Sequence, residues 1–194
     1  WMMSYGIGSF SQNILDEFNK NCTVAEIEQG LEDNFAVDIS PFANIILTSP
    51  RCTLEDVWVT VKRCVQLVAQ GAEVGMNPYC MAFPGANILR DSGVAELVSE
   101  KAVVVEGTDI RFKKTDKIIP ADERVQQLLE LMEQGVDRQY DGNKVTSARR
   151  SNIILYALLE AFESMGVHAE EADTYQALVG PRTKAIAAGI DQEV

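Results

Sequence analysis

Several features that usually mark a catalytic or membrane function are missing from this sequence of 194 residues. It has one histidine, so a site built on two or more imidazoles is excluded. None of its apolar runs approaches the roughly 20 residues that a membrane-spanning helix needs. It contains no G-x-x-x-x-G-K-[ST] or G-x-G-x-x-G phosphate-binding loop, and the G-x-G pair at residues 6–8 is weak on its own.

Cysteine is scarce and scattered, which excludes a disulfide scaffold. Cys22, Cys52, Cys64 and Cys80 are separated by 30, 12 and 16 residues, so neither C-x-x-C nor C-x-x-x-C-x-x-C occurs. No charged segment followed by an apolar core marks a signal peptide. We therefore expect free, mostly buried thiols, no metal site within the chain and a cytoplasmic location.

Basic side chains are also few, because 17 Lys and Arg stand against 29 Asp and Glu, a net charge of −12. Residues 1–100 hold 13 acidic and 5 basic side chains, and residues 101–194 hold 16 and 12. An acidic surface repels phosphate backbones, so nucleic acid is not an expected partner. The one basic cluster, residues 111–117, is expected to form a solvated strand edge, with contact to an acidic partner or an RNA phosphate as the alternative.

Residues 1–100 alternate between strand-like and helix-like segments. Three apolar, strand-like runs lie at 5–7, 41–48 and 74–81. Thr23 and Glu26 form the T-x-x-E capping box of one helix. Thr53 begins another, whose apolar residues recur every three or four positions until Gly71 ends it. This alternation predicts an α/β fold with a parallel sheet.

The pattern changes near residue 100. Short strands are expected at 103–105 and 109–112, and helices without intervening strands at 122–140, 146–164 and 170–179. We therefore expect an α/β part at 1–100 followed by a mostly helical extension at 101–194. The acidic pairs at 16–17, 55–56 and 170–171 are expected near the first turns of helices, where the helix dipole accounts for them. His168 is expected to be a solvated residue at a helix entry.

Polar or glycine-rich turns follow the three expected strands, at 6–9, 48–51 and 82–85. Ligands of parallel α/β proteins bind at the carboxyl ends of the strands. By this placement we expect Ser9, Asn44 and Arg51 to face a ligand, and Arg51 suits a carboxylate. Ordinary strand-to-helix turns are the alternative, and no catalytic residue is identified.

These turns, in this order, resemble the second half of the barrel of radical S-adenosylmethionine (radical SAM) enzymes of the cobalamin-associated type. Gly6-Ile7-Gly8-Ser9, with Asn19-Lys20 after the helix, is similar to the fourth-strand signature of that family. Residues 44–56 resemble the fifth strand and its T-x-E-D helix start. Pro78 with residues 83–87 resembles the P-x-P-G-T ending of the sixth strand. The resemblance covers roughly residues 5–90.

The resemblance implies a partial (βα) barrel-like sheet that binds S-adenosylmethionine and works with a [4Fe–4S] cluster, with or without cobalamin, on an unknown small-molecule or peptide substrate. The C-x-x-x-C-x-x-C loop that holds the cluster is absent from this chain. We therefore expect a fragment that is not competent alone, whose missing N-terminal barrel half precedes Trp1. Three parallel strands are also expected to leave an open sheet edge.

One position departs from the family pattern. Gly8 stands where the fourth strand of the family usually carries Glu. This departure favours the alternative function, a degenerate, non-catalytic α/β module that binds a protein partner or a small ligand.

Overall fold

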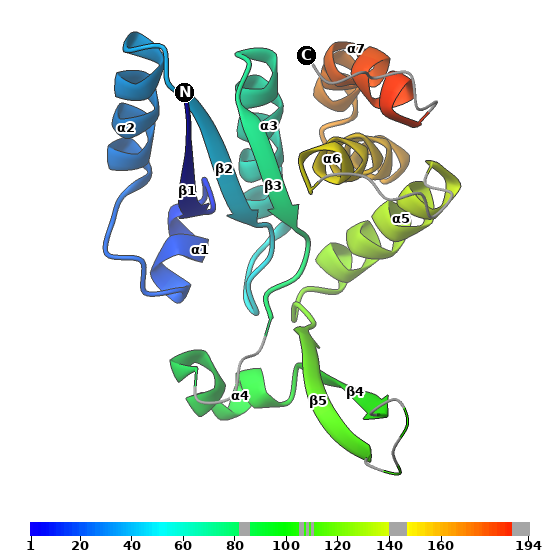
Figure 1. Ribbon diagram of the computed structural model, residues 1–194. Coiled ribbons are helices and arrows are strands. Elements are labelled where there is room, and N and C mark those ends of the chain that lie inside the picture. Colours follow the sequence, from blue (N-terminus) through cyan, green and yellow to red (C-terminus); the bar gives the residue numbers. More distant parts are fainter. Residues whose placement is uncertain (82–85, 105–106, 108, 110, 140–146, 188–194) are drawn as a thin grey trace.

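The computed structural model describes residues 1–81, 86–104, 107, 109, 111–139 and 147–187 (Figure 1). The fold is mixed α/β, as expected from the sequence. Its centre is a parallel sheet of three strands that lie side by side in chain order: β1 (Met2–Gly8), β2 (Ser40–Ile46) and β3 (Glu73–Asn77). The turn at 82–85, which carries the Phe83-Pro84-Gly85 part of the resemblance, lies outside the described residues.

The helices between the strands begin where the sequence places them. They are α1 (Gln12–Glu17), α2 (Val24–Ala36) and α3 (Leu54–Ala69). The side chains of Thr23 and Glu26 form the expected capping box on α2, and Thr53 caps α3 in the same way. Gly71 follows α3 with a φ of 90°, a conformation that glycine adopts without strain. The prediction of these two helix starts is confirmed.

The two faces of the sheet have opposite characters. Ala43, Ile45, Val74 and Met76 point to the same face and are buried in the core with residues of α3. Figure 1 shows α3 against one face of the sheet. Because side chains alternate along a strand, residues 42, 44 and 46 of β2 lie on the other face. We call that second face the open face, and its exposed members are Met2, Ser4, Gly6, Asn44 and Asn77.

The second half of the chain adds a hairpin and a helical bundle. Its elements are η1 (Asn87–Arg90), α4 (Ser92–Ala95), β4 (Val98–Val104), β5 (Arg111–Ile118), α5 (Glu123–Gln139), α6 (Ser147–Ser164) and α7 (Ala169–Ala187). The three long helices lie where helices were predicted, but α7 was expected to be short and to end near residue 179, whereas it continues past Pro181 to Ala187. The two strands are longer than expected, since antiparallel pairing of β4 with β5 extends from Val104 and Arg111 back to Val98 and Ile118. No helix in the described ranges is long and apolar enough to cross a membrane.

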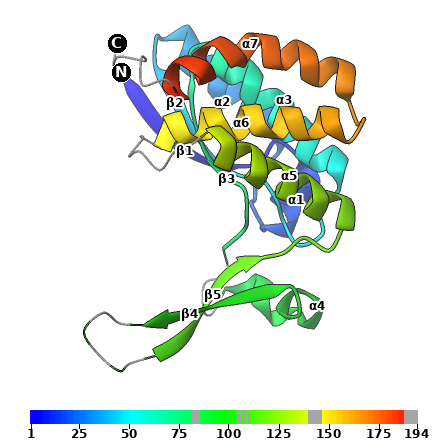
Figure 2. The same ribbon diagram turned by 90° about the vertical axis from the view of Figure 1, so that its right-hand side faces the viewer.

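The helical bundle packs against β3 and α3 and shares their core (Figure 2). The Met76 amide donates a hydrogen bond of 2.8 Å to the Ser151 hydroxyl on α6. This helix therefore covers the outer edge of β3, and the expectation of an open edge is wrong on this side of the sheet. Trp58 of α3 meets Phe162 of α6 edge to face, with ring centroids 5.0 Å apart.

His168 stands at the entry of α7, as expected, but it is not simply solvated. Its ring stacks on Trp58 with a centroid separation of 4.7 Å and an interplanar angle of 6°. Its Nε2 lies 3.0 Å from Glu55 on α3. This histidine therefore helps to hold the start of α7 against α3.

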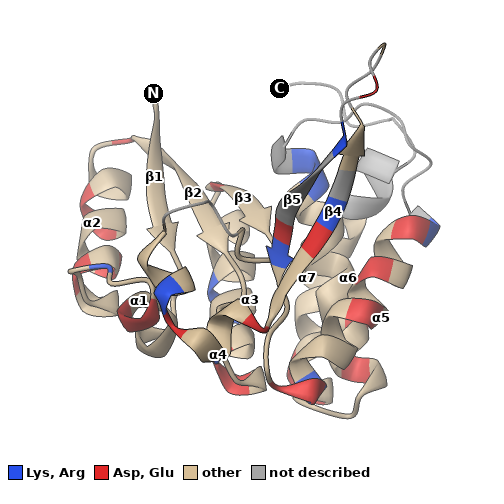
Figure 3. Cartoon of the chain, turned by 90° about the horizontal axis from the view of Figure 1, so that it is seen from below, with Lys and Arg blue, Asp and Glu red and all other residues tan. Residues whose placement is uncertain are grey.

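A second, smaller apolar cluster lies beyond the carboxyl ends of the strands. It is centred on Cys80, Val94 and Ile118, with Phe18 and Ile46 packed against it. This cluster places η1 and α4 across the carboxyl end of the sheet, as Figure 3 shows from that side. In the same view, the red segments along α2 and α5 mark their Asp and Glu residues.

Candidate functional site at the carboxyl ends of the strands

Asp56 is the most densely hydrogen-bonded side chain at this end of the sheet. It is only 7% exposed, at the start of α3. Its Oδ1 accepts hydrogen bonds from Ser11 Oγ at 2.5 Å and from Asn13 Nδ2 at 2.9 Å. Its Oδ2 accepts from the amide and the hydroxyl of Thr53, at 2.9 and 2.8 Å. One carboxylate thus caps α3 and ties it to the start of α1.

These donors decide the protonation state of Asp56. Burial by itself raises the pKa of a carboxyl group, because it disfavours the charged form. The donors from Ser11, Thr53 and Asn13 favour the charged form more strongly, so the pKa of Asp56 lies below its ordinary value. The group is therefore a carboxylate at neutral pH and acts as an acceptor only.

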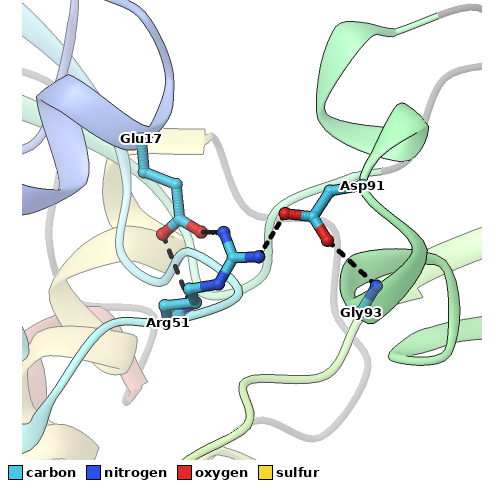
Figure 4. Close-up of polar contacts among 4 residues, drawn as sticks. All are labelled: Glu17, Arg51, Asp91 and Gly93. Atoms are coloured by element: carbon cyan, nitrogen blue, oxygen red, sulfur yellow. Dashed lines mark hydrogen bonds and ion pairs between the residues drawn. The ribbon is translucent and has the colours of Figure 1, made fainter.

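Arg51, in the turn between β2 and α3, joins two separate elements (Figure 4). Its Nη1 lies 3.3 Å from Glu17 Oε1 on α1, and its backbone amide donates to the other oxygen of Glu17, also at 3.3 Å. Its Nη2 pairs with Asp91, which caps α4 through a 2.9 Å bond from the Gly93 amide. The guanidinium therefore clamps α4 to the end of the sheet.

The clamp shifts the pKa values of both partners in the direction that keeps them charged. The hydrogen bond and charge of Asp91 raise the pKa of Arg51 above its ordinary value. Arg51, and then the Gly93 amide, lower the pKa of Asp91. Both side chains are largely exposed, so water and salt weaken this pair.

Next to the clamp lies a hollow of about 350 Å³. Its lining consists of polar and acidic side chains around one guanidinium and one thiol: Asn13, Glu17, Ser49, Arg51, Cys52, Thr53 and Asp56. Burial raises the pKa of the Cys52 thiol to about 12, so this cysteine is not a thiolate nucleophile at neutral pH. With two carboxylates against one guanidinium, the hollow suits a ligand that brings an amine or several hydrogen-bond donors.

The open face carries a second set of polar groups. Asn44 Nδ2 donates to Ser4 Oγ across the β1–β2 pair, at 2.9 Å. Gly75 of β3 lies on the same face, where an added Cβ would stand 2.9 Å from the Phe42 ring and 3.0 Å from Asn44 Oδ1. The absence of a side chain at Gly75 thus makes room for Phe42 and Asn44.

Lys20 lies over the carboxyl end of β1. Its Nζ donates to the Gly6 carbonyl at 2.8 Å. Gly8 has a φ of 90°, and a Cβ there would stand 3.4 Å from Lys20 Cε. A glutamate at position 8 would be strained in this backbone conformation, which gives a local physical reason for glycine.

The three residues expected to face a ligand occupy different environments. Ser9 is fully buried and its hydroxyl bonds with Thr60 Oγ1 at 2.8 Å, so it fastens the end of β1 to α3. Asn44 is exposed on the open face, and Arg51 is exposed in the clamp. Within the described residues, no hydrogen bond joins any two of the three. A ligand contact at each of them stays a prediction.

Sequence reasoning passed over Glu17, Asp56 and Asp91 as functional groups. The acidic pair 16–17 was expected near the first turn of a helix, but Glu17 is the last residue of α1, where it faces Arg51 instead of the positive helix end. Asp56 does lie in a first turn, and the T-x-x-D spacing was the available signal. Nothing local in the sequence links Asp91 to Arg51, 40 positions away.

The cysteines of this chain are not arranged as ligands of an iron–sulfur cluster in the described residues. Within the described residues, no group of three or more His, Cys, Asp or Glu is arranged to hold a metal ion. Cys52, Cys64 and Cys80 are buried, and each has its pKa raised chiefly by desolvation. Cys22 is partly buried on another part of the chain. No chemical step through a cluster is therefore derived for these residues.

Comparison of the chain with protein-family models, with curated proteins and with solved structures gives no match.

Proposed function

We propose that the α/β part is half of a radical SAM barrel, and that its open face forms part of the wall of the S-adenosylmethionine and substrate cavity. The observation that carries this proposal is the uneven cover of the sheet. Ala43, Ile45, Val74 and Met76 are buried on one face, whereas Ser4, Gly6, Asn44 and Asn77 are exposed on the other.

This arrangement is unusual for a complete parallel sheet. All-parallel sheets occur almost entirely with both faces covered, either between two layers of helices or as closed barrels. In a barrel, the inner face is enclosed by further strands and not by helices. Three strands in chain order with polar residues and glycines on the inner side agree with part of such a wall.

The proposal assigns binding, not radical formation, to this chain. In the family, the cluster supplies the electron that cleaves S-adenosylmethionine, and here that chemistry would belong to the missing barrel half. Asn44 holds a carboxamide on the open face, oriented by its hydrogen bond to Ser4. Asn77 adds a second exposed carboxamide at the end of β3. These groups can donate to and accept from ribose hydroxyls or a polar substrate.

One observation favours the second candidate, a non-catalytic module that binds a partner or a small ligand. Gly8 replaces the glutamate of the family pattern, and its φ of 90° with Lys20 close by leaves no unstrained place for that side chain. A module that had lost S-adenosylmethionine chemistry would be free to lose this residue.

Binding to the isolated chain tests the proposal. We expect S-adenosylhomocysteine, a stable analogue, to shift the ¹H–¹⁵N NMR signals of Gly6, Asn44 and Gly75 at millimolar concentration, because half of a site binds weakly. Asn44→Ala should abolish these shifts, and Asn21→Ala, an exposed asparagine outside the open face, should not. Shifts confined to other parts of the chain, or none at all, would overturn the proposal.

The upstream codons separate the two candidates. For the barrel half, the reading frame is expected to continue before Trp1 into a strand followed by C-x-x-x-C-x-x-C. A stop codon directly ahead of residues 1–3 would favour the non-catalytic module.

A further inference from the structure

A separate cavity of about 390 Å³ lies beside the carboxyl end of β3, between α5 and α6. Its lining comes from four parts of the chain that are distant in sequence: Pro78, Tyr79, Lys117, Met132, Glu133, Val136, Asp137, Arg150 and Ile154. The volume falls at the small end of the range for small-molecule pockets, about 300–1,000 Å³. The lining includes no residue of the open face and none of the Arg51 clamp.

The inner part of this cavity is apolar and held firmly. Met132 and Val136 come from α5, and Ile154 comes from α6. The two helices approach closely beside them, since a Cβ on Gly135 would stand only 2.9 Å from the Ala157 Cβ. This contact leaves little freedom for α5 and α6 to separate, so the apolar surface is present before any ligand arrives.

One wall is a charged cluster that is already neutralised. Tyr79 donates its hydroxyl hydrogen to Glu133 Oε1 at 2.7 Å. Lys117 Nζ donates to the same oxygen at 3.2 Å and lies 3.6 Å from the centre of the Tyr79 ring. Burial, reinforced by Glu133, raises the pKa of Tyr79, so the phenol keeps its proton. This wall is rigid and carries no net charge of its own.

The rim of the cavity carries two side chains of opposite charge that are not paired with any described residue. Arg150 at the start of α6 and Asp137 near the end of α5 are exposed, and neither side chain has a hydrogen bond or ion pair with the described residues. The neighbouring arginines differ, because Arg138 pairs with Glu160 and Arg149 also has a partner. A cation and an anion at the rim of one partly apolar cavity, each without a partner among the described residues, favour a ligand that carries both charges.

We propose that this cavity binds a zwitterionic amino acid with an apolar side chain. Arg150 receives the carboxylate, for which a guanidinium has matched donor geometry. Asp137 accepts from the ammonium group, and the apolar side chain covers the half-buried Val136, while Met132 and Ile154, already almost fully buried, complete the apolar lining. A ligand with a single charge would leave one rim group without a partner, and a ligand without an apolar side chain would leave the half-buried Val136 in contact with water.

The test is an NMR titration of the ¹⁵N-labelled chain with L-leucine. We expect saturable shifts for residues 132–137 and 150–154. Isoamylamine lacks the carboxylate, isocaproate lacks the amine and glycine lacks the apolar side chain, so each should bind more weakly than leucine. Arg150→Ala should weaken leucine binding about tenfold, the effect of losing one charge-assisted contact. Asp137→Asn should weaken it by a similar factor.

Matched controls come from α5, the helix that carries Asp137. Arg124→Ala and Glu123→Gln change exposed charges of α5 that do not line the cavity, and leucine affinity should stay unchanged. Circular dichroism checks that every variant is folded. Equal binding of leucine and isocaproate, leucine affinity unaffected by Arg150→Ala, or no saturable shift would each overturn the inference. None of these outcomes depends on binding at the open face, so the two proposals fail or succeed separately.

Discussion

Replacing Asp56 by alanine should destabilise the protein far more than breaking the equivalent capping box on α2. Both boxes have the same design in the sequence, with a threonine cap and an acidic residue three positions later. Glu26 is exposed and bonds only with Thr23, however, whereas Asp56 is buried and also accepts from Ser11 and Asn13. The comparison therefore isolates the effect of burial and tertiary partners.

The magnitude follows from the bonds that Asp56 makes. Loss of a helix cap costs about 1 kcal/mol. Hydrogen bonds to a charged group contribute about 1.5–3 kcal/mol each, and their contributions overlap when they share one acceptor. Because Asp56→Ala also leaves the Ser11 hydroxyl buried without its acceptor, we expect a total loss of roughly 3 kcal/mol in the free energy of unfolding.

The effect should depend on pH. The pKa of Asp56 is lower in the folded chain than the ordinary value of about 3.9 that applies when unfolded. Its contribution to stability is therefore fully present above that ordinary value and is lost as the pH falls through the folded pKa. The difference in stability between the wild type and Asp56→Asn should be constant near neutral pH and shrink in strong acid.

Urea denaturation followed by circular dichroism measures these differences. Glu26→Ala is the matched control, because it removes the same box and leaves no buried donor without a partner. If Asp56→Ala and Glu26→Ala lost equal stability, or if the Asp56→Asn difference grew in acid, the argument from the shared carboxylate would be refuted.

Three further predictions concern single positions. Gly75→Ala should lower the free energy of unfolding in urea by about 2 kcal/mol, since its Cβ would press on the Phe42 ring of the neighbouring strand. Gly30→Ala, whose Cβ would meet nothing within 4 Å, should raise the same free energy by ~0.8 kcal/mol. A Gly75→Ala variant as stable as the wild type would contradict the close packing of Gly75 against Phe42. Gly8→Glu should cost about 2 kcal/mol because of its positive φ, and unchanged urea unfolding would show that the family glutamate is tolerated there. A thiol reagent at pH 8 should label the partly buried Cys22 first, while Cys52, with its pKa raised to about 12, reacts slowly; equal rates would show that its burial is transient.

Local patterns in the sequence located most of the elements. The capping boxes at Thr23 and Thr53 and the glycine at position 71 fix helix ends through contacts within a few residues. The apolar spacing of α3, α5 and α6 is likewise local, so periodicity was a sufficient guide to them, whereas it did not predict that α7 continues past residue 179 to Ala187. The hairpin bounds were missed because strand length depends on pairing between Val98 and Ile118, which no local pattern contains.

The candidate site was less accessible to such reasoning. Placement after a strand led to Ser9, but the direction of its side chain was decided by Thr60 on α3, 51 positions away. Placement also led to Arg51, but its partners Glu17 and Asp91 come from 34 and 40 positions away. The cavity at β3 was invisible in the sequence because Tyr79, Lys117 and Arg150 share no motif.

The sequence by itself determined the kinds of elements, their order and the positions of several helix ends, because capping, periodicity and turn chemistry act between near neighbours. The sequence also shows a single histidine and no clustered cysteines, which excludes a site built on two imidazoles and a C-x-x-C type metal site within this chain. Only the tertiary structure decided which face of the sheet is not covered by helices. It also decided that Ser151 of α6 hydrogen-bonds to the outer edge of β3, and that Asp56 caps α3 while accepting a hydrogen bond from Ser11 at the start of α1. These features depend on contacts between residues far apart in the chain. Local sequence preferences allow several such arrangements, and burial and hydrogen-bond geometry determine which one forms.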